Sequence, residues 1–127
     1  MRALNLEDST GAPGNAAYFA GQVTLRPVIE DCGPAKLYRV EFAPGARTNW
    51  HTHSGVQVLV VLGGRCRYQQ AGGPVLEASA GEVIHIPAGE KHWHGATPSA
   101  PMVHLAVNLA ADTTWLEVVT DEEYEGG

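Results

Sequence analysis

The stretch that decides the fold is Gly45–Gly64, GARTNWHTHSGVQVLVVLGG. Within it, His51 and His53 are two residues apart, and on an extended strand such residues project from the same face. The apolar, β-branched run Val56–Leu62 follows and stops at a Gly-Gly pair, which favours a second strand that ends in a hairpin turn. The stretch therefore predicts successive strands with two imidazoles on one face.

A second stretch, Gly81–Gly95 (GEVIHIPAGEKHWHG), repeats this arrangement at His92 and His94. Gln57 lies four residues after His53, early in the next strand, where its side chain can face the same cavity. Three imidazoles and one amide oxygen that converge inside a barrel would suit a divalent transition metal. A His-x-His pair can also lie on the surface, and a single buried His is more often an ordinary core residue, so the residue pattern leaves these alternatives open.

Short strands separated by turns are predicted along the rest of the chain. Gly and Pro number 15 and 8, and no helical pattern of ten or more residues is present. Pro27 favours an edge position for the first long strand. We expect an all-β sandwich or barrel. Its strands are predicted at Val23–Val28, Leu37–Phe42, Thr48–His53, Val56–Leu62, Arg65–Gln70, Val75–Ala78, Val83–Ile86, His92–Gly95, Met102–Leu109 and Trp115–Val119.

The 127 residues are expected to form a single domain. Residues 1–20, rich in small and polar side chains, predict a loosely ordered N-terminal arm. Residues 21–120 form the expected barrel, and residues 121–127 a short helical or irregular C-terminal tail. Strand edges and the apolar run Val56–Leu62 favour a homodimer or homotetramer, because exposed edges need covering.

Charge and hydropathy exclude several classes of partner. The net charge is −6, which disfavours binding to nucleic acid. The sequence also lacks a run of basic residues of the kind that would predict binding to an anionic membrane. The N-terminal residues lack the apolar core of a secretory signal, and no apolar stretch reaches the roughly 18–20 residues of a membrane helix. A cytoplasmic location is expected, where Cys32 and Cys66 would be free, packed thiols without a catalytic role.

The two histidine stretches resemble the two sequence motifs of cupins, which implies the double-stranded β-helix, or jelly-roll, barrel. The matching patterns are Gly45-x5-His51-x-His53-x3-Gln57-x6-Gly64 and Gly81-x5-Pro87-x-Gly89-x2-His92. The resemblance implies that one divalent metal ion is held by His51, His53, Gln57 and His92.

Two positions depart from the usual cupin pattern. Gln57 stands where the family usually has a glutamate ligand, and Ala96 stands where the second motif ends in Asn. A neutral amide leaves the full +2 charge on the ion, which makes a stronger Lewis acid but a weaker binding site. The alternative interpretation is a cupin that has lost its metal.

The runs GARTNWHTH and GEKHWHGA, with Gln57, His104 and the terminal VTDEEY, are similar to the small manganese-dependent cupin hydroxynitrile lyases of bacteria. This similarity implies cleavage of an aromatic cyanohydrin, such as (R)-mandelonitrile, to aldehyde and HCN. It implies that Mn²⁺ is the metal, with Fe, Zn, Ni or Co as alternatives. It also implies that His94 is the general base, and the alternative role of His94 is to hydrogen-bond a metal ligand. His104 is either a proton relay or cyanide-binding group, or a hydrogen-bonding partner of another histidine. An iron-dependent dioxygenase of the quercetinase type and a non-catalytic small-molecule-binding protein are the alternative functions.

Several other side chains have weaker predicted roles. Arg47 is expected to tether the preceding Pro-Gly turn, and Glu90 and Lys91 to form a solvated surface pair. The sequence does not decide which way His85 faces. An aromatic lining suits an aromatic small molecule and equally suits any packed barrel. The expected cavity lining consists of Tyr38, Val40, Phe42, Trp50, Leu59, Val61, Trp93 and Leu105.

Overall fold

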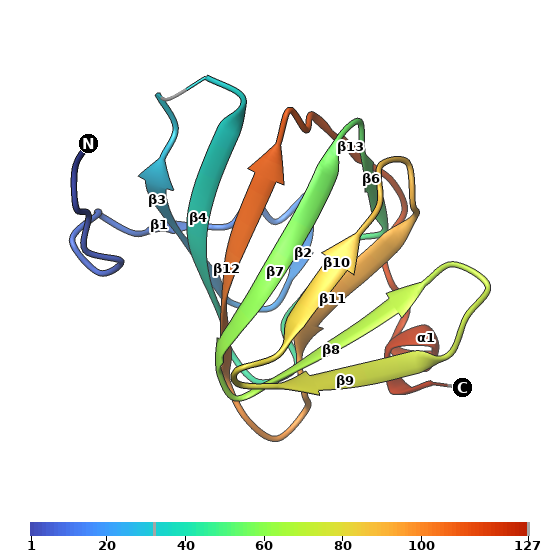
Figure 1. Ribbon diagram of the computed structural model, residues 1–127. Coiled ribbons are helices and arrows are strands. Elements are labelled where there is room, and N and C mark those ends of the chain that lie inside the picture. Colours follow the sequence, from blue (N-terminus) through green and yellow to red (C-terminus); the bar gives the residue numbers. More distant parts are fainter. Residues whose placement is uncertain (32, 127) are drawn as a thin grey trace.

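Two antiparallel sheets curl toward each other in the structure, a computed structural model that describes residues 1–31 and 33–126 (Figure 1). The strands are β1 (Ala12–Pro13), β2 (Phe19–Ala20), β3 (Val23–Ile29), β4 (Ala35–Phe42), β5 (Arg47–Thr48), β6 (His51–His53), β7 (Val56–Gly63), β8 (Arg65–Gln70), β9 (Val75–Ser79), β10 (Val83–Ile86), β11 (His92–Ala96), β12 (Met102–Leu109) and β13 (Thr113–Trp115). A single short helix, α1 (Asp121–Glu125), was found in the described residues. The all-β prediction is confirmed.

The strand order explains how distant stretches of sequence meet. One sheet has the order β1-β3-β4-β12-β7-β10, and the other has the order β13-β6-β11-β5-β2, with β8 paired to β11 and β9 paired to β8. Strand β11 pairs with β6 so that His92 lies opposite His51. Strand β12 lies between β4 and β7, with Asn108 opposite Gln57. The two histidine stretches are therefore joined within one sheet, and the strand that carries Gln57 belongs to the facing sheet.

Alternation along the strands builds the core between the sheets. In β7 the side chains of Gln57, Leu59 and Val61 are buried, while the residues between them are partly exposed or exposed. Phe42 and Met102 are each 1% exposed and lie opposite each other on β4 and β12. This period of two is what a strand with one buried face requires.

Most of the predicted strands are confirmed within two residues of their bounds, and three details were wrong. The segment expected as one strand at Thr48–His53 is divided into β5 and β6 by Asn49 and Trp50. The last strand is Thr113–Trp115 and not Trp115–Val119. Residues 1–20 are not a loose arm throughout, because β1 pairs with β3 and β2 pairs with β5.

Two local predictions have mixed outcomes. Pro27 lies beside a register irregularity of β3, and β1 pairs with β3 only at Thr24 and Leu25, so the strand is next to the edge and not fully at it. Cys66 is a free, buried thiol, and burial raises its pKa to about 12. Cys32 lies outside the described residues.

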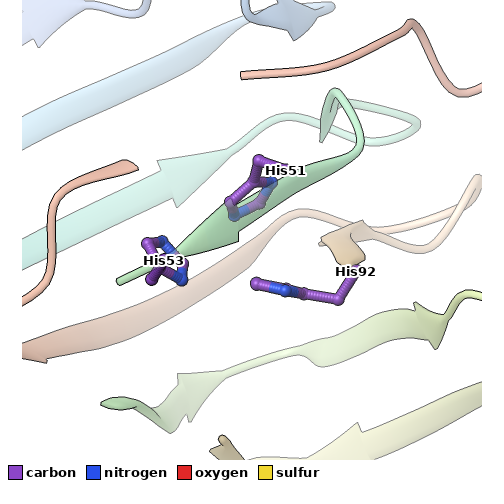
Figure 2. A group of neighbouring side chains, drawn as sticks. All are labelled: His51, His53 and His92. Carbon is purple, nitrogen blue, oxygen red and sulfur yellow. The ribbon is translucent and has the colours of Figure 1, made fainter. Parts of the chain in front are cut away.

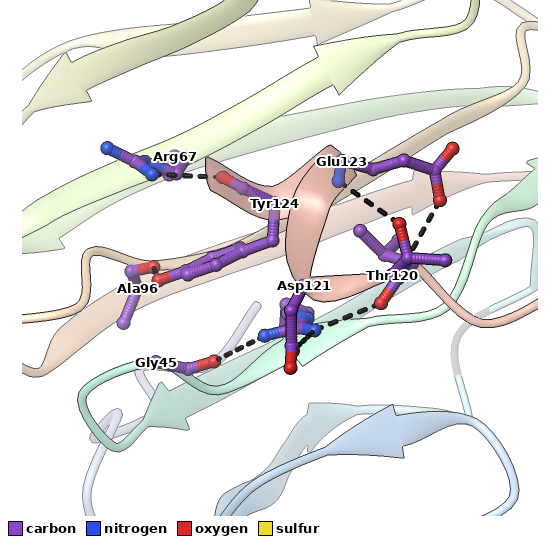
Figure 3. A network of polar contacts seen from close by, with 9 residues as sticks. Gly45, Arg67, Ala96, Thr120, Asp121, Glu123 and Tyr124 are labelled. Atoms are coloured by element: carbon purple, nitrogen blue, oxygen red, sulfur yellow. Dashed lines mark hydrogen bonds and ion pairs between the residues drawn. The ribbon is translucent and has the colours of Figure 1, made fainter. Parts of the chain in front are cut away.

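The C-terminal tail contains a short capped helix that packs against the barrel (Figure 3). Thr120 and Glu123 form a capping box at its start. The Tyr124 hydroxyl donates a hydrogen bond to the carbonyl oxygen of Ala96 on β11, and the guanidinium of Arg47 lies 4.4 Å from the centre of the Tyr124 ring. Tyr124 also belongs to a second apolar cluster with Trp50, Trp93 and Val119.

Two expectations remain predictions. One is the division of the chain at residues 20 and 120, and the other is assembly into a homodimer or homotetramer. In the described part of the chain, β10 pairs only with β7 and β9 only with β8, and Leu76 and Val83 are exposed beside these edges. No helix among these residues has the length and apolar character needed to cross a membrane.

Candidate metal centre

Three buried imidazoles converge in the barrel (Figure 2). His51 and His53 lie on β6 and project from the same face, as their spacing predicts. His92 reaches them from the neighbouring strand β11, because it is the register partner of His51. One ring nitrogen from each of the three lies within 4.8 Å of the others. The predicted convergence of these three side chains is therefore present.

Backbone carbonyls fix two of these rings. The Nδ1–H of His51 donates to the carbonyl oxygen of Asn49 at 2.8 Å, and the Nδ1–H of His92 donates to that of Glu90 at 2.8 Å. Because a carbonyl oxygen can only accept, the proton of each neutral ring is on Nδ1 and the lone pair is on Nε2. The Nε2 atom of His92 is buried without a hydrogen-bond partner in the described residues.

Gln57 lines the same pocket as His51 and His53. Its side-chain Nε2 donates a hydrogen bond to Oδ1 of Asn108 at 2.9 Å. Its Oε1 atom is buried and has no hydrogen-bond partner among the residues described. A buried acceptor without a donor is costly in a folded protein. A cation in this site would supply the missing partner.

The protonation of the three imidazoles also suits a metal. Burial, followed by the neighbouring His92, lowers the pKa of His53 to about 4 and that of His51 well below its ordinary value. Burial lowers the pKa of His92 as well. All three rings are therefore neutral at pH 7, which is the state in which histidine binds a metal. Three imidazole nitrogens and one amide oxygen fit a divalent transition metal.

A second pair of histidines lies beside this cluster. His94 is two residues after His92 on β11, and the centres of these two rings are 5.7 Å apart. The Nε2 atom of His104, on β12, lies 3.1 Å from Nδ1 of His94. Both side chains are buried, and the ring of Phe42 packs against both. His104, Ala106 and Asn108, which alternate along β12, all line the pocket.

These side chains line a pocket of about 450 Å³ between the two sheets. As predicted, Tyr38, Val40 and Phe42 line it. Trp50 and Trp93 do not, because they pack with the C-terminal helix in the second apolar cluster.

Leu59, Val61 and Leu105 are also absent from the pocket lining. Leu59 and Val61 are in the main core. Leu105 alternates with His104 on β12, so its side chain projects from the opposite face of that sheet.

The sequence analysis missed an aromatic group at the pocket. The rings of Tyr18 and Trp115 are stacked with centres 4.7 Å apart, and Phe19 meets the edge of Trp115 at 5.5 Å. Trp115 also lies 4.8 Å from the ring of His51, its register partner across β13 and β6. The strands β2 and β13 have only two and three residues, so no alternating pattern marks these side chains as inward.

The remaining predicted side chains lie away from the metal ligands. His85 is exposed on β10. Lys91 pairs with Glu117 at 2.8 Å, so the expected pair with Glu90 was wrong. Arg47 does bind the Pro-Gly turn, through the carbonyl oxygen of Gly45 at 3.4 Å.

Comparisons with known proteins agree with this geometry. The cupin domain family matches residues 38–108, which include all four candidate ligands. A protein named (R)-mandelonitrile lyase, from Granulicella tundricola, is 44% identical over 129 residues that cover 98% of each chain. This chain belongs to the cupin family.

Solved cupin structures resemble it closely. The crystal structure of a cupin-like protein from Thermotoga maritima is 37% identical with a TM-score of 0.88, and the match covers 91% of each chain. The polyketide cyclase RemF from Streptomyces resistomycificus has a TM-score of 0.74 at 24% identity, covering 98% of this cupin and 91% of the cyclase. The latter match shows the shared fold alone. The predicted jelly-roll barrel is confirmed.

Proposed function

We propose that this cupin is a metal-dependent carbon–carbon lyase that cleaves cyanohydrins, such as (R)-mandelonitrile, to an aldehyde and HCN. The proposal depends on one observation: the buried His94–His104 pair lies beside a three-imidazole cluster in the same barrel. It is supported by the 44% identity of nearly the whole chain to a protein named (R)-mandelonitrile lyase.

His51, His53, His92 and Gln57 would hold the metal ion, and we propose Mn²⁺ as that ion. A bound divalent ion supplies Lewis acidity to an oxygen of the substrate. All four proposed ligands are neutral, so the centre would keep a charge of +2. This charge favours stabilisation of an anionic oxygen or cyanide over chemistry that needs a high oxidation state of the metal.

His94 has the properties of the general base. Burial, followed by the neighbouring His104, holds the pKa of His94 well below its ordinary value, so the ring is neutral at pH 7. Its Nε2 atom is buried and without a hydrogen-bond partner in the described part of the chain. With its Nδ1–H donated to Nε2 of His104, His94 would present the lone pair of Nε2 to the substrate.

The proton movements in this reaction balance on His94. The ring takes the hydroxyl proton of the cyanohydrin, the O–H electron pair becomes the second bond of the aldehyde carbonyl, and the carbon–nitrile bond breaks. Cyanide leaves with the electrons of that bond and receives the proton back from the His94 imidazolium as HCN. His104 would stabilise the imidazolium by accepting the hydrogen bond from its Nδ1–H.

The pocket suits an aromatic substrate. Its volume of about 450 Å³ is within the usual range for small-molecule sites. Phe42 lies inside, and Tyr18, Phe19 and Trp115 form an aromatic group at the same pocket. Offset or edge contacts with such rings favour a phenyl group over an aliphatic chain of equal size.

The test is a metal analysis combined with an assay on racemic mandelonitrile. We expect bound or reconstituted Mn²⁺ near one ion per chain and metal-dependent release of benzaldehyde with an enantiomer preference. Chelator-treated protein is the control. Metal-replete protein with no rate above that of buffer would reject the lyase. Oxygen consumption with Fe²⁺ would assign a dioxygenase, and tight ligand binding without product under any metal would assign a binding protein.

A further inference from the structure

The side-chain amide of Gln57 has a hydrogen-bond partner on the neighbouring strand. Asn108 on β12 is the register partner of Gln57 on β7, and directly opposed residues share a face of the sheet. Both side chains line the pocket. The 2.9 Å hydrogen bond from Gln57 Nε2 to Asn108 Oδ1 directs the NH₂ end toward Asn108 and leaves the buried Oε1 atom without a hydrogen-bond partner in the residues described.

A glutamine amide has two nearly isosteric ends with opposite properties, since its oxygen accepts and its NH₂ group donates. Rotation by half a turn about the last side-chain bond exchanges them. In the exchanged orientation the NH₂ group would face the imidazole cluster and could not bind a cation. A glutamate at this position would have no such ambiguity, because both of its oxygens are ligands.

We propose that Asn108 is a positioning residue that locks the Gln57 amide with its oxygen toward the metal, and thereby makes a neutral fourth ligand effective. The inference rests on the metal centre of the proposed function. In the orientation that Asn108 has in the structure, its Oδ1 atom faces Gln57 and accepts a hydrogen bond that only the NH₂ end of Gln57 can donate. Groups that orient a metal ligand commonly change metal affinity by about 10–100-fold when removed.

The first experiment titrates the metal-free protein with Mn²⁺ and measures free Mn²⁺ by electron paramagnetic resonance. Asn108→Leu removes the acceptor at similar volume, and we expect it to weaken Mn²⁺ binding about 10-fold or more. Asn108→Asp keeps an acceptor at the same place, so its affinity is expected to equal or exceed that of the wild type. Unchanged affinity in Asn108→Leu, within twofold, would overturn the proposal.

Double variants in which Gln57 is also replaced separate the orientation of its amide from a general effect of Asn108 on the site. In Gln57→Glu both terminal atoms of the side chain are oxygens that can bind the ion, so there is no end to select, and we expect Asn108→Leu to weaken Mn²⁺ binding there by less than it does in the wild type. A smaller loss in the glutamate background is therefore the result that orientation of the amide predicts. In Gln57→Ala there is no amide to orient, and Asn108→Leu is expected to change affinity by less than twofold. An equal loss in the Gln57→Ala background would assign Asn108 a structural role only.

Two controls complete the experiment. Thermal unfolding of each metal-free variant, followed by circular dichroism, identifies any protein that does not fold, and Asn108→Ala, which also removes the acceptor, decides the matter if Asn108→Leu is unfolded. Wild-type protein that binds Mn²⁺ but releases no benzaldehyde would reject the lyase and leave the positioning role standing. Wild-type protein that binds no Mn²⁺ would overturn both.

Discussion

Nε2 of His104 and Nδ1 of His94 lie 3.1 Å apart, joined by a hydrogen bond between two buried rings on facing sheets. A single proton lies between these two nitrogens when both rings are neutral. The bond therefore couples the tautomers of the two rings, because one nitrogen must donate and the other must accept. It also connects His94, beside the candidate ligands, to a strand that carries none of the three histidine ligands.

Replacement of His94 should separate catalysis from metal binding. We expect His94→Ala to retain Mn²⁺ near the wild-type stoichiometry and to lose 100-fold or more in kcat/KM for mandelonitrile, about the lower bound for a positioned general base. The measurements are metal content and benzaldehyde release on the same sample. His51→Ala is the matched control and should lose the metal. Full activity in His94→Ala would reject the base assignment.

Acid should destabilise the metal-free protein through His104. Burial lowers the pKa of His104 to about 4, from an ordinary value of 6.5. Between these values the unfolded chain binds the proton and the folded chain does not, so stability is fully present above pH 6.5 and is lost as the pH falls toward 4. The difference corresponds to roughly 3 kcal/mol for this one ring.

Urea unfolding at pH 7 and pH 4.5 checks this prediction. His104→Gln removes the titrating group while keeping a polar side chain of similar length. Its free energy of unfolding should fall less than that of the wild type between the two pH values, even if it is lower at pH 7. Parallel pH profiles for the two proteins would contradict the assignment of this loss to His104.

Tyr124 should contribute to stability without affecting the metal. Tyr124→Phe keeps the ring beside Arg47 but removes the hydrogen bond to the carbonyl oxygen of Ala96, which is buried. We expect a loss of about 1–2 kcal/mol in the free energy of unfolding, with Mn²⁺ affinity unchanged. Glu125→Gln, at an exposed position of the same helix, is the control and should change stability by less than about 0.5 kcal/mol. Equal effects of the two substitutions would show that the hydrogen bond has no stabilising role.

Strand alternation was enough to predict that His51 and His53 project from the same face. The meeting of His92 with His51 could not be derived from local pattern, because it depends on which strands pair. It came from the resemblance to the cupin motifs. The bond between Gln57 and Asn108 depends on the exact register of β7 against β12, and nothing in either strand specifies that register locally.

The aromatic group at the pocket could not be predicted from the sequence, for a different reason. Phe19 belongs to a two-residue strand, and Tyr18 lies just before it. Strand β2 pairs with β5, which is itself only two residues long, so neither segment carries a periodic signal of its own. The prediction of a loose arm failed at the residues that pair with β5.

The charge of the fourth ligand should set a balance between metal affinity and catalysis. Gln57→Glu replaces a neutral oxygen donor with an anionic one, so the centre would change from +2 to +1 with the ion bound. We expect Mn²⁺ to bind at least about tenfold more tightly, since about 1.4 kcal/mol of added attraction is enough for that factor. The developing negative charge on the substrate oxygen would be stabilised less, and kcat for mandelonitrile should fall.

Competition of the protein with a chelator for Mn²⁺ measures the affinity, and benzaldehyde release at saturating Mn²⁺ measures kcat. Gln57→Ala is the control, because it removes the oxygen donor and should weaken binding. A rise in kcat with the glutamate, or an affinity equal to that of the wild type, would mean that the neutral charge of Gln57 is not what tunes this centre. Tighter Mn²⁺ binding together with slower turnover in Gln57→Glu would mean that the neutral amide lowers the metal affinity and leaves the bound ion more electrophilic.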